Sequence, residues 1–536
     1  MARNAIDSMV SSLPTMPALL EHIGYPKQRK ALSFFQITIA LLAGYAHALS
    51  IAWPFSFGFA KGQPLWWLQL LALGVLVWQL DRCTRWKQGL ILGWSFATAW
   101  LCGTFWWLFI SLNIYGGLAA PLTVLAIVGL AVFLSTYYAV ACAAFVSLSL
   151  LRPMRRAIVF AALWLLAELA RVEFFTGFPW GEAGYAHLGS WLDNYARWIG
   201  VHGMTFMAAF VAASLAGLGY SRRQVLVVPV VLLLMVGVSL VAGRQTSTSA
   251  GNLPVTLLQG NIPQDEKFQP GSGVPTALRW YAEQLQAVKT PLVIAPETAI
   301  PLLPANLPAG YLSSVQSRFA TGQQAALVGM PLGSLAEGYA NAVVGLKPGQ
   351  PKAYLFEKHH LVPFGEFVPP GFRWFINLMN IPLGDFRRGP LGQPSFEWQG
   401  QRIAPNICYE DLFGEELAGS FVDAASAPTI MANVSNIGWF GNTVAIDQHL
   451  NISRMRTLEF ERPMIRATNT GATVVIDHRG KVTHELPRHT RGVLVAEVEG
   501  RNGITPFAWW ASRFGLWPLW GLGLAVVALA LALRRR

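Results

Sequence analysis

Two kinds of hydrophobic pattern divide this chain of 536 residues. Long apolar runs dominate residues 1–245 and 501–536, whereas residues 246–500 carry short apolar runs separated by polar ones. Because a bilayer core is crossed by roughly 20 apolar residues of helix, the long runs predict membrane-spanning helices. We predict eight spans, at about residues 31–52, 64–80, 89–112, 120–149, 157–171, 204–220, 225–243 and 515–533.

Basic residues between the predicted spans indicate which side of the membrane each loop faces. They cluster in every second loop, and the loop at 113–119 carries no charge. Since cytoplasmic loops carry the excess of Lys and Arg, we predict that both termini are cytoplasmic and that residues 244–513 lie on the opposite side. The clusters are Lys27, Arg29 and Lys30; Arg82, Arg85 and Lys87; Arg152, Arg155 and Arg156; Arg222 and Arg223; and Arg534, Arg535 and Arg536.

Composition favours a membrane protein and argues against a nucleic-acid-binding one. Hydrophobic residues make up 53% of the chain and charged residues 13%, which is too apolar for an ordinary soluble enzyme. Much of the net charge of +12 comes from the juxtamembrane clusters, where it sets topology and meets anionic lipid. We therefore expect the lipid bilayer, and no nucleic acid, as a partner.

Residues 246–500 alternate between strand-like and helix-like segments. This alternation predicts an extracytoplasmic α/β domain with a largely buried sheet. It would lie between an N-terminal membrane domain of about seven spans (1–245) and a C-terminal transmembrane helix (501–536). The predicted strands are 255–259, 292–296, 325–329, 341–346, 403–408, 429–433, 473–477 and 493–498, and the predicted helices lie near 275–288, 309–320, 411–425 and 445–460.

Three side chains with complementary chemistry sit at the ends of strand-like runs in this domain. Glu297 and Lys358 each follow such a run, and Cys408 ends one. Because chemistry in α/β sheets gathers at the carboxyl ends of strands, we expect these groups to converge. The carboxylate would take the thiol proton and the ammonium would stabilise the oxyanion of a tetrahedral intermediate. Together they form a set of groups suited to acyl transfer.

Cys408 is set apart from the other cysteines, which all fall in or beside the apolar segments: Cys83, Cys102 and Cys142. It cannot form a disulfide within its own domain, and a free thiol outside the cytoplasm is open to oxidation. Its presence there favours covalent chemistry. Each of the three groups also has an ordinary alternative, namely a small core residue, a capping or surface glutamate, and a solvated lysine.

Three segments resemble the catalytic motifs of the nitrilase (carbon–nitrogen hydrolase) superfamily, and more narrowly those of the apolipoprotein N-acyltransferase family. They are Pro296-Glu297-Thr298, the run EKHHLVPFGEFVP at 357–369, and Ile407-Cys408-Tyr409-Glu410. Supporting segments lie at 259–263, 433–436, 438–441 and 447–450. The resemblance covers nearly the whole chain and implies a polytopic α-helical membrane domain with an inserted α-β-β-α sandwich.

The same resemblance implies a role for each site residue. Glu297 would be the general base, Lys358 the oxyanion-stabilising group and Cys408 the nucleophile. The further implied residues are Glu366, which positions the lysine; Tyr409 and Glu410, beside the cysteine; Asn341, which lines the pocket; and Phe268 and Trp439, which contact substrate. Ile437 and Phe268 depart from the family pattern, which often has Asp and Trp at those positions.

The resemblance also implies a reaction and its partners. A membrane phospholipid, expected to be phosphatidylethanolamine, would acylate the cysteine. The thioester would then pass its acyl chain to the N-terminal α-amine of a diacylglyceryl-cysteine apolipoprotein, the last step of bacterial lipoprotein maturation. We expect no cofactor and no metal, since the histidines lack metal-ligand spacing. We further expect a monomer in the bacterial inner membrane, with a periplasmic catalytic domain.

Two other functions compete with this one. A membrane-anchored nitrilase-like amidase would use the same three groups with water as acceptor and a small amide as substrate. A transporter or receptor would use the α/β domain only for binding, and would be favoured by intramembrane charges, of which Glu168 and Arg171 are the main candidates.

Overall fold

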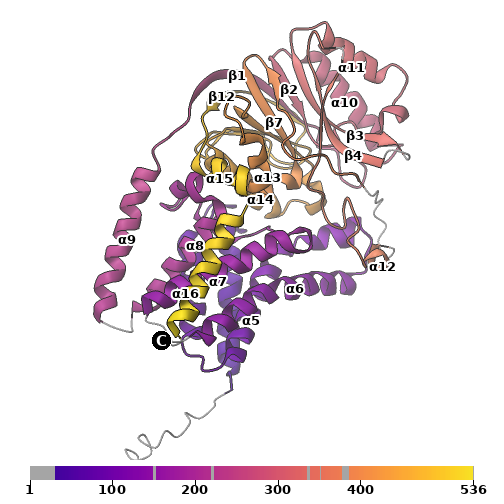
Figure 1. Cartoon of the computed structure of the whole chain (residues 1–536). Helices are drawn as coiled ribbons and strands as arrows, with labels where there is room; N and C mark the ends of the chain where they lie inside the picture. The colour runs from indigo at the N-terminus through magenta and orange to yellow at the C-terminus, as the bar shows by residue number, and fades with distance from the viewer. Residues whose placement is uncertain are drawn as a thin grey trace, which may run out of the picture.

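The computed structural model of the chain describes residues 31–148, 153–218, 222–334, 338–350, 352–376 and 386–534. A helical bundle forms one end of the molecule and a β-rich domain the other, and the C-terminal helix α16 returns to the bundle (Figure 1). Several basic residues that entered the topology prediction lie outside the described residues: Lys27, Arg29, Lys30, Arg152, Arg535 and Arg536.

A helix lies at each of the eight predicted span positions. Five helical segments of the described chain are long and apolar enough to cross a membrane: Phe34–Ile51, Ala120–Ser147, Asp193–Ala216, Val225–Ala242 and Trp517–Arg534. The helices are α3 (Phe34–Ile51), α4 (Trp66–Leu80), α5 (Trp86–Phe105), α6 (Ala120–Ser147), α7 (Pro153–Glu173), α8 (Ala196–Ala216), α9 (Arg222–Ala242) and α16 (Trp517–Arg534).

Helix α7 is less apolar because it carries charged residues, including Glu168 and Arg171. Both of these side chains are fully buried. The Arg171 guanidinium donates to the carbonyl of Trp180 (2.9 Å), and the Glu168 carboxylate accepts from the backbone N–H of Ala183 (3.1 Å). Charges inside membrane bundles normally face partners of this kind. Glu168 and Arg171 thus have structural partners within the protein.

The β-rich domain contains two six-stranded sheets, ordered β12-β1-β2-β3-β4-β5 and β11-β10-β9-β8-β7-β6. In each sheet three adjacent inner strands, β1-β2-β3 and β7-β8-β9, run parallel. The strands are β1 (Thr248–Gln259), β2 (Leu292–Ala295), β3 (Ala325–Ser334), β4 (Gly338–Leu346), β5 (Tyr354–Glu357), β6 (Phe396–Trp398), β7 (Gln401–Ile407), β8 (Ile430–Ser435), β9 (Met464–Thr468), β10 (Val474–Ile476), β11 (Val482–Glu485) and β12 (Gly492–Asn502).

The two sheets share a hydrophobic core. Val255 of β1 belongs to the same buried cluster as Ile403 of β7 and Ile430 of β8. A second cluster joins the first sheet to α10 (Gly273–Ala287) and α11 (Tyr311–Ala320). Helix α14 (Ala445–Phe460) lies between the second sheet and the bundle (Figure 1).

The segment after Cys408 differs from its prediction. Instead of one helix over 411–425, it forms a 3-10 turn (Cys408–Leu412), a single α-turn, α13 (Gly414–Leu417), and a second 3-10 turn (Ala418–Phe421). A Cβ on Gly414 would lie 2.0 Å from the Arg456 guanidinium, so this segment packs closely against α14. The chain therefore turns sharply just after the cysteine.

Helix α14 joins the β-rich domain to the bundle. The side-chain carbonyl of Gln448 accepts hydrogen bonds from the indoles of Trp107 (3.0 Å) and Trp180 (2.8 Å). Further along α14, the Glu459 carboxylate accepts from the backbone N–H of Val201 (2.7 Å). Buried bonds of this kind fix the orientation of the β-rich domain on the bundle, because leaving any partner unpaired would be costly.

Candidate active site

Cys408 lies at the end of β7 in a strained backbone conformation. Its φ of 53° is in the left-handed region, which a non-glycine residue adopts only where the surroundings enforce it. The surroundings here are two side chains that donate to the Cys408 carbonyl, the amide of Asn433 (3.3 Å) and the ring of His449 (3.2 Å). The strand and the turn after it therefore meet in a sharp corner at the thiol.

Glu297, Lys358, Glu366 and Asn341 form one hydrogen-bonded cluster. The Asn341 amide donates to Glu297 Oε1 (2.7 Å) and to Glu366 Oε1 (2.9 Å). The Lys358 ammonium donates to Glu366 Oε1 (2.9 Å) and lies 3.7 Å from Glu297 Oε1. The other oxygen of Glu297 accepts from the backbone N–H of Asn436 (2.8 Å). These bonds fix the carboxylates and the ammonium relative to one another.

Electrostatics tie Cys408 to this cluster. Burial and the Glu297 carboxylate raise the pKa of the Cys408 thiol to about 12, although Lys358 opposes the shift. Burial alone would lower the pKa of Lys358, but Glu366, Glu297 and Cys408 together raise it. The resting site therefore holds a protonated thiol and a charged lysine, and the thiol needs a base to react.

Glu410 and Tyr409 brace the cysteine rather than face it. Glu410 Oε1 accepts from the backbone N–H of His359 (2.7 Å), the residue after Lys358, and Oε2 accepts from that of Ile407 (2.6 Å). Burial raises the pKa of the Glu410 carboxyl to about 7. The buried Tyr409 hydroxyl donates to the carbonyl of Gly177 in the bundle (3.3 Å).

Phe268 and Trp439, the expected substrate-contacting residues, differ in their surroundings. Phe268 is 41% exposed and follows the buried Lys267, which bonds to the Glu297 backbone. Trp439 is half-buried and meets Tyr115 of the bundle edge-to-face at 5.8 Å between ring centres. Their contact with substrate stays a prediction.

Lys267 is a residue that the sequence alone did not single out. It is 2% exposed, and its ammonium donates to the Glu297 carbonyl (3.1 Å). Burial lowers its pKa to about 7, while Glu297 and Cys408 act in the opposite direction. A second buried amine thus lies beside the candidate base. Its position shortly after the 259–263 segment is the one sequence signal that pointed to this loop.

Potential metal ligands gather elsewhere. Within the described chain, Glu168, Glu182 and His202 bring three possible ligand atoms within 4.8 Å of one another. All three side chains are buried in the bundle, and the fully buried Arg171 beside them supplies a positive charge. The Glu297 cluster instead pairs two carboxylates with the Lys358 ammonium.

Comparison with known proteins follows the same division of the chain. Residues 40–214 match the apolipoprotein N-acyltransferase N-terminal domain, and residues 255–502 match the carbon-nitrogen hydrolase domain. Among solved structures, a carbon-nitrogen hydrolase from Helicobacter pylori covers 50% of this chain and 94% of its own, at 14% identity and a TM-score of 0.34.

Curated relatives cover nearly the whole chain. The apolipoprotein N-acyltransferase of Verminephrobacter eiseniae is 53% identical over 90% of this chain and 94% of its own. That of Ralstonia nicotianae is 40% identical over 94% of each. With both domains matched in order and identity at this level, the chain belongs to the apolipoprotein N-acyltransferase family.

Proposed function

We propose that this protein transfers a fatty acyl chain from a membrane phospholipid, through a thioester on Cys408, to the N-terminal amine of a diacylated apolipoprotein. The observation that carries the proposal is that the half-buried Cys408 lies within electrostatic range of the buried Glu297 and Lys358. Membership of the family supports the reaction class, and the relatives give no support to the amidase alternative.

The first half-reaction is acylation of the enzyme. Glu297 removes the thiol proton as sulfur attacks the ester carbonyl, which is needed because the pKa of Cys408 is raised to about 12. The Lys358 ammonium stabilises the oxyanion. When the intermediate collapses, the C–O bond breaks, and Glu297 returns the proton to the departing lysophospholipid alkoxide. The acyl group is then held as a thioester.

The second half-reaction moves the acyl group to nitrogen. The acceptor α-amine attacks the thioester, Lys358 again stabilises the oxyanion, and the C–S bond breaks. Glu297 accepts the amine proton and passes it to the leaving thiolate, so the enzyme returns to its resting state. The side-chain carbonyl of Asn341 is buried without a partner in the described part of the chain, and an incoming N–H would satisfy it.

The architecture supports lipid substrates. Drawing an acyl chain from the bilayer into water costs about 0.8 kcal/mol per CH₂, so a site next to the membrane avoids that cost. We assign residues 1–245 and 501–536 to the membrane with eight spans, and residues 246–500 to a four-layer α-β-β-α catalytic domain on the periplasmic side of the inner membrane. Phosphatidylethanolamine is the proposed donor, and a monomer the proposed state.

Intact-mass analysis tests this function. Incubating the purified enzyme with phosphatidylethanolamine and no acceptor should add one acyl mass, which Cys408→Ala abolishes. Cys102→Ala, a matched change in α5, should keep the adduct. Adding a diacylated lipopeptide should discharge it to an N-acylated product, whereas water should not. Transfer by Cys408→Ala, or an active enzyme that never carries the adduct, would contradict the thioester route.

A further inference from the structure

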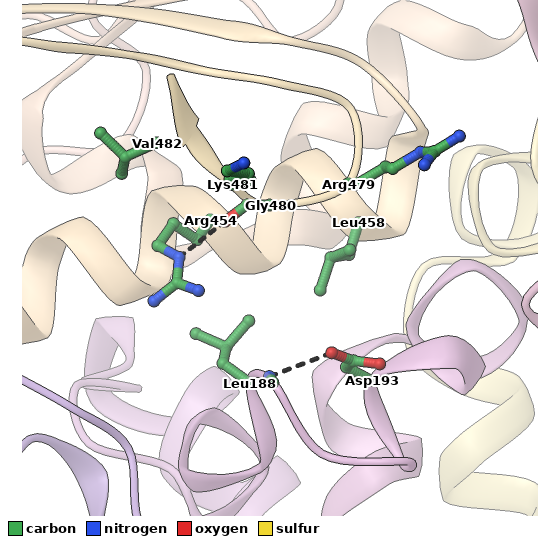
Figure 2. Close-up of a pocket in the computed structure, with 9 residues that line it drawn as sticks. Leu188, Asp193, Arg454, Leu458, Arg479, Gly480, Lys481 and Val482 are labelled. Atoms are coloured by element: carbon green, nitrogen blue, oxygen red, sulfur yellow. Dashed lines mark hydrogen bonds between the residues drawn. The ribbon is translucent and has the colours of Figure 1, made fainter. Parts of the chain in front are cut away.

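A pocket lies where the β-rich domain meets the bundle, apart from the candidate active site. It has a volume of about 330 Å³ and is lined from below by the loop at 188–193 and from above by α14 and the turn between β10 and β11 (Figure 2). Its size is within the range of small-molecule sites, roughly 300–1,000 Å³. Since loops from both parts of the chain form it, the pocket exists only in the assembled protein.

The floor of this pocket is attached to the end of a candidate membrane span. The Asn194 amide donates to the Ser239 hydroxyl (3.0 Å), and the Trp198 indole donates to the Ala242 carbonyl (3.1 Å). Ser239 and Ala242 belong to the last turns of α9, whose apolar side chains are mostly exposed. Where α9 leaves the apolar layer, lipid headgroups begin. Given the proposed membrane placement, the pocket lies at headgroup depth.

Opposite charges face each other across the pocket. Arg454 of α14 donates to the Gly480 carbonyl (2.7 Å) and to Asn451 Oδ1 (3.0 Å), which holds its guanidinium above the gap. Asp193 lies below and accepts from the backbone N–H of Gly189 (3.0 Å) (Figure 2). The two charges attract each other, yet they form no ion pair within 4.0 Å among the described residues. Arg479 and Lys481, which are both exposed, add two further positive charges on the upper side.

A positive side chain and a negative side chain on opposite sides of a pocket suit a ligand that carries both charges. A phosphate would pair with Arg454 and Lys481, and a cationic group with Asp193. Among the described residues, the lining has no aromatic side chain of the kind that holds quaternary ammonium groups, so a primary ammonium with N–H donors fits better. The rest of the lining includes Leu188, Leu458 and Val482. These apolar side chains suit the apolar part of a lipid next to its headgroup.

From this arrangement we infer that the pocket binds the 2-aminoethyl phosphate headgroup of a membrane phospholipid. The site is separate from the reacting groups, because Arg454 lies five residues after His449 on α14, about 140° around the helix. His449 faces Cys408, and Arg454 faces the pocket. A lipid held here would fix the enzyme against the membrane rather than donate its acyl chain.

Native mass spectrometry of the full-length enzyme in detergent tests the site. The probes are phosphatidylethanolamine and phosphatidylglycerol with identical acyl chains, the second of which lacks the ammonium. The wild-type enzyme should retain phosphatidylethanolamine more tightly than phosphatidylglycerol. Asp193→Asn should weaken that binding about fivefold and leave the phosphatidylglycerol binding intact or stronger. Lys481→Gln should weaken both. Glu283→Gln and Lys289→Gln, matched charge changes on the far side of the catalytic domain, should change neither.

Two competition arms identify the ligand. Free 2-aminoethyl phosphate should displace the retained lipid at lower concentration than inorganic phosphate; equal displacement would show a simple phosphate site and overturn the inference. Unchanged lipid preference in Asp193→Asn would also overturn it. Acylation of Cys408 is measured in parallel, since the headgroup variants should still form the thioester. A variant that loses the thioester but keeps its lipid preference would count against the pocket. Loss of acylation in the wild type and all variants would instead count against the proposed function.

Discussion

Glu410 Oε1 accepts the backbone N–H of His359 at 2.7 Å. This bond joins the residue after Lys358 to the second residue after Cys408, so it links the two motifs that carry the lysine and the thiol. Through Oε2 the same carboxylate also holds Ile407, the residue before the cysteine (2.6 Å). Glu410 therefore determines the spacing of the ammonium and the thiol without facing either reacting atom.

Removing this brace should lower the acylation rate. Glu410→Ala frees two strand ends, and a displacement of about 1 Å at the reacting groups is enough for a loss of about 10²-fold. Glu410→Gln should show an intermediate loss, because its amide N–H₂ would face the Ile407 N–H, which is also a donor. Single-turnover thioester formation measures both. Glu283→Ala, an exposed change on α10, should be silent, and equal activity of the Ala and wild-type enzymes would contradict the role.

The main parts of the site could be predicted from the sequence because their signals are local. Glu297 and Lys358 each follow a short apolar run and Cys408 ends one, and chemistry in α/β sheets gathers at the carboxyl ends of the strands that such runs form. The long apolar runs likewise predicted helices at all eight positions, where the structure has them. The helix predicted over 411–425 was wrong, because the chain there forms 3-10 turns and one α-turn. This segment packs against α14, a contact between distant parts of the chain that no local pattern could indicate.

Lys358 should be needed for charge and for shape. Its ammonium nitrogen lies 2.9 Å from Glu366 Oε1 and 3.7 Å from Glu297 Oε1, so a compact positive charge is held close to both carboxylates. Lys358→Met should reduce acylation by about 10²–10³-fold, the usual cost of losing an oxyanion donor. Lys358→Arg should not restore the rate, because a planar fork cannot occupy the same position. Quenched-flow measurement of the rate of thioester formation tests both variants, with Lys347→Met as a surface control.

Arg466 shows why another strand escaped prediction. It lies in the middle of β9 and is fully buried, so its charge interrupts the apolar pattern by which strands are recognised. In the structure it is paired with Asp411 (3.4 Å) and donates to His449 (2.6 Å). Since Asp411 and His449 come from other elements, no local pattern could have indicated that this arginine is buried.

Gly329 should be irreplaceable behind the candidate base. A Cβ at this position of β3 would lie 2.3 Å from the Pro296 carbonyl and 2.7 Å from Glu297 Cα, so any side chain must push the Glu297 backbone away. Gly329→Ala should therefore lose activity by about 10²-fold or more. Gly271→Ala, where a Cβ meets nothing within 4 Å, is the matched control and should be fully active. Retained activity in Gly329→Ala would show that Glu297 tolerates displacement.

Lys267 gives a prediction about pH. Its amine has an ordinary pKa of 10.5, and burial lowers the pKa to about 7 in the folded protein. Between these values the unfolded chain binds more protons than the folded one, so this group makes the protein more stable as pH rises from 7 towards 10.5. Below pH 7 both states are protonated, and the full cost of burying the charge is present.

Lys267→Met should remove this dependence. The apparent melting temperature of the wild type relative to the variant should rise between pH 7 and pH 9, while Lys289→Met, an exposed lysine, should follow the wild type throughout. Because the ammonium also donates to the Glu297 carbonyl, the variant should acylate Cys408 more slowly at every pH. Parallel melting curves for wild type and Lys267→Met would mean that the amine is not desolvated beside Glu297. The interpretation of Lys267 as a buried amine that holds the Glu297 backbone in place would then fail, even if the variant were slow.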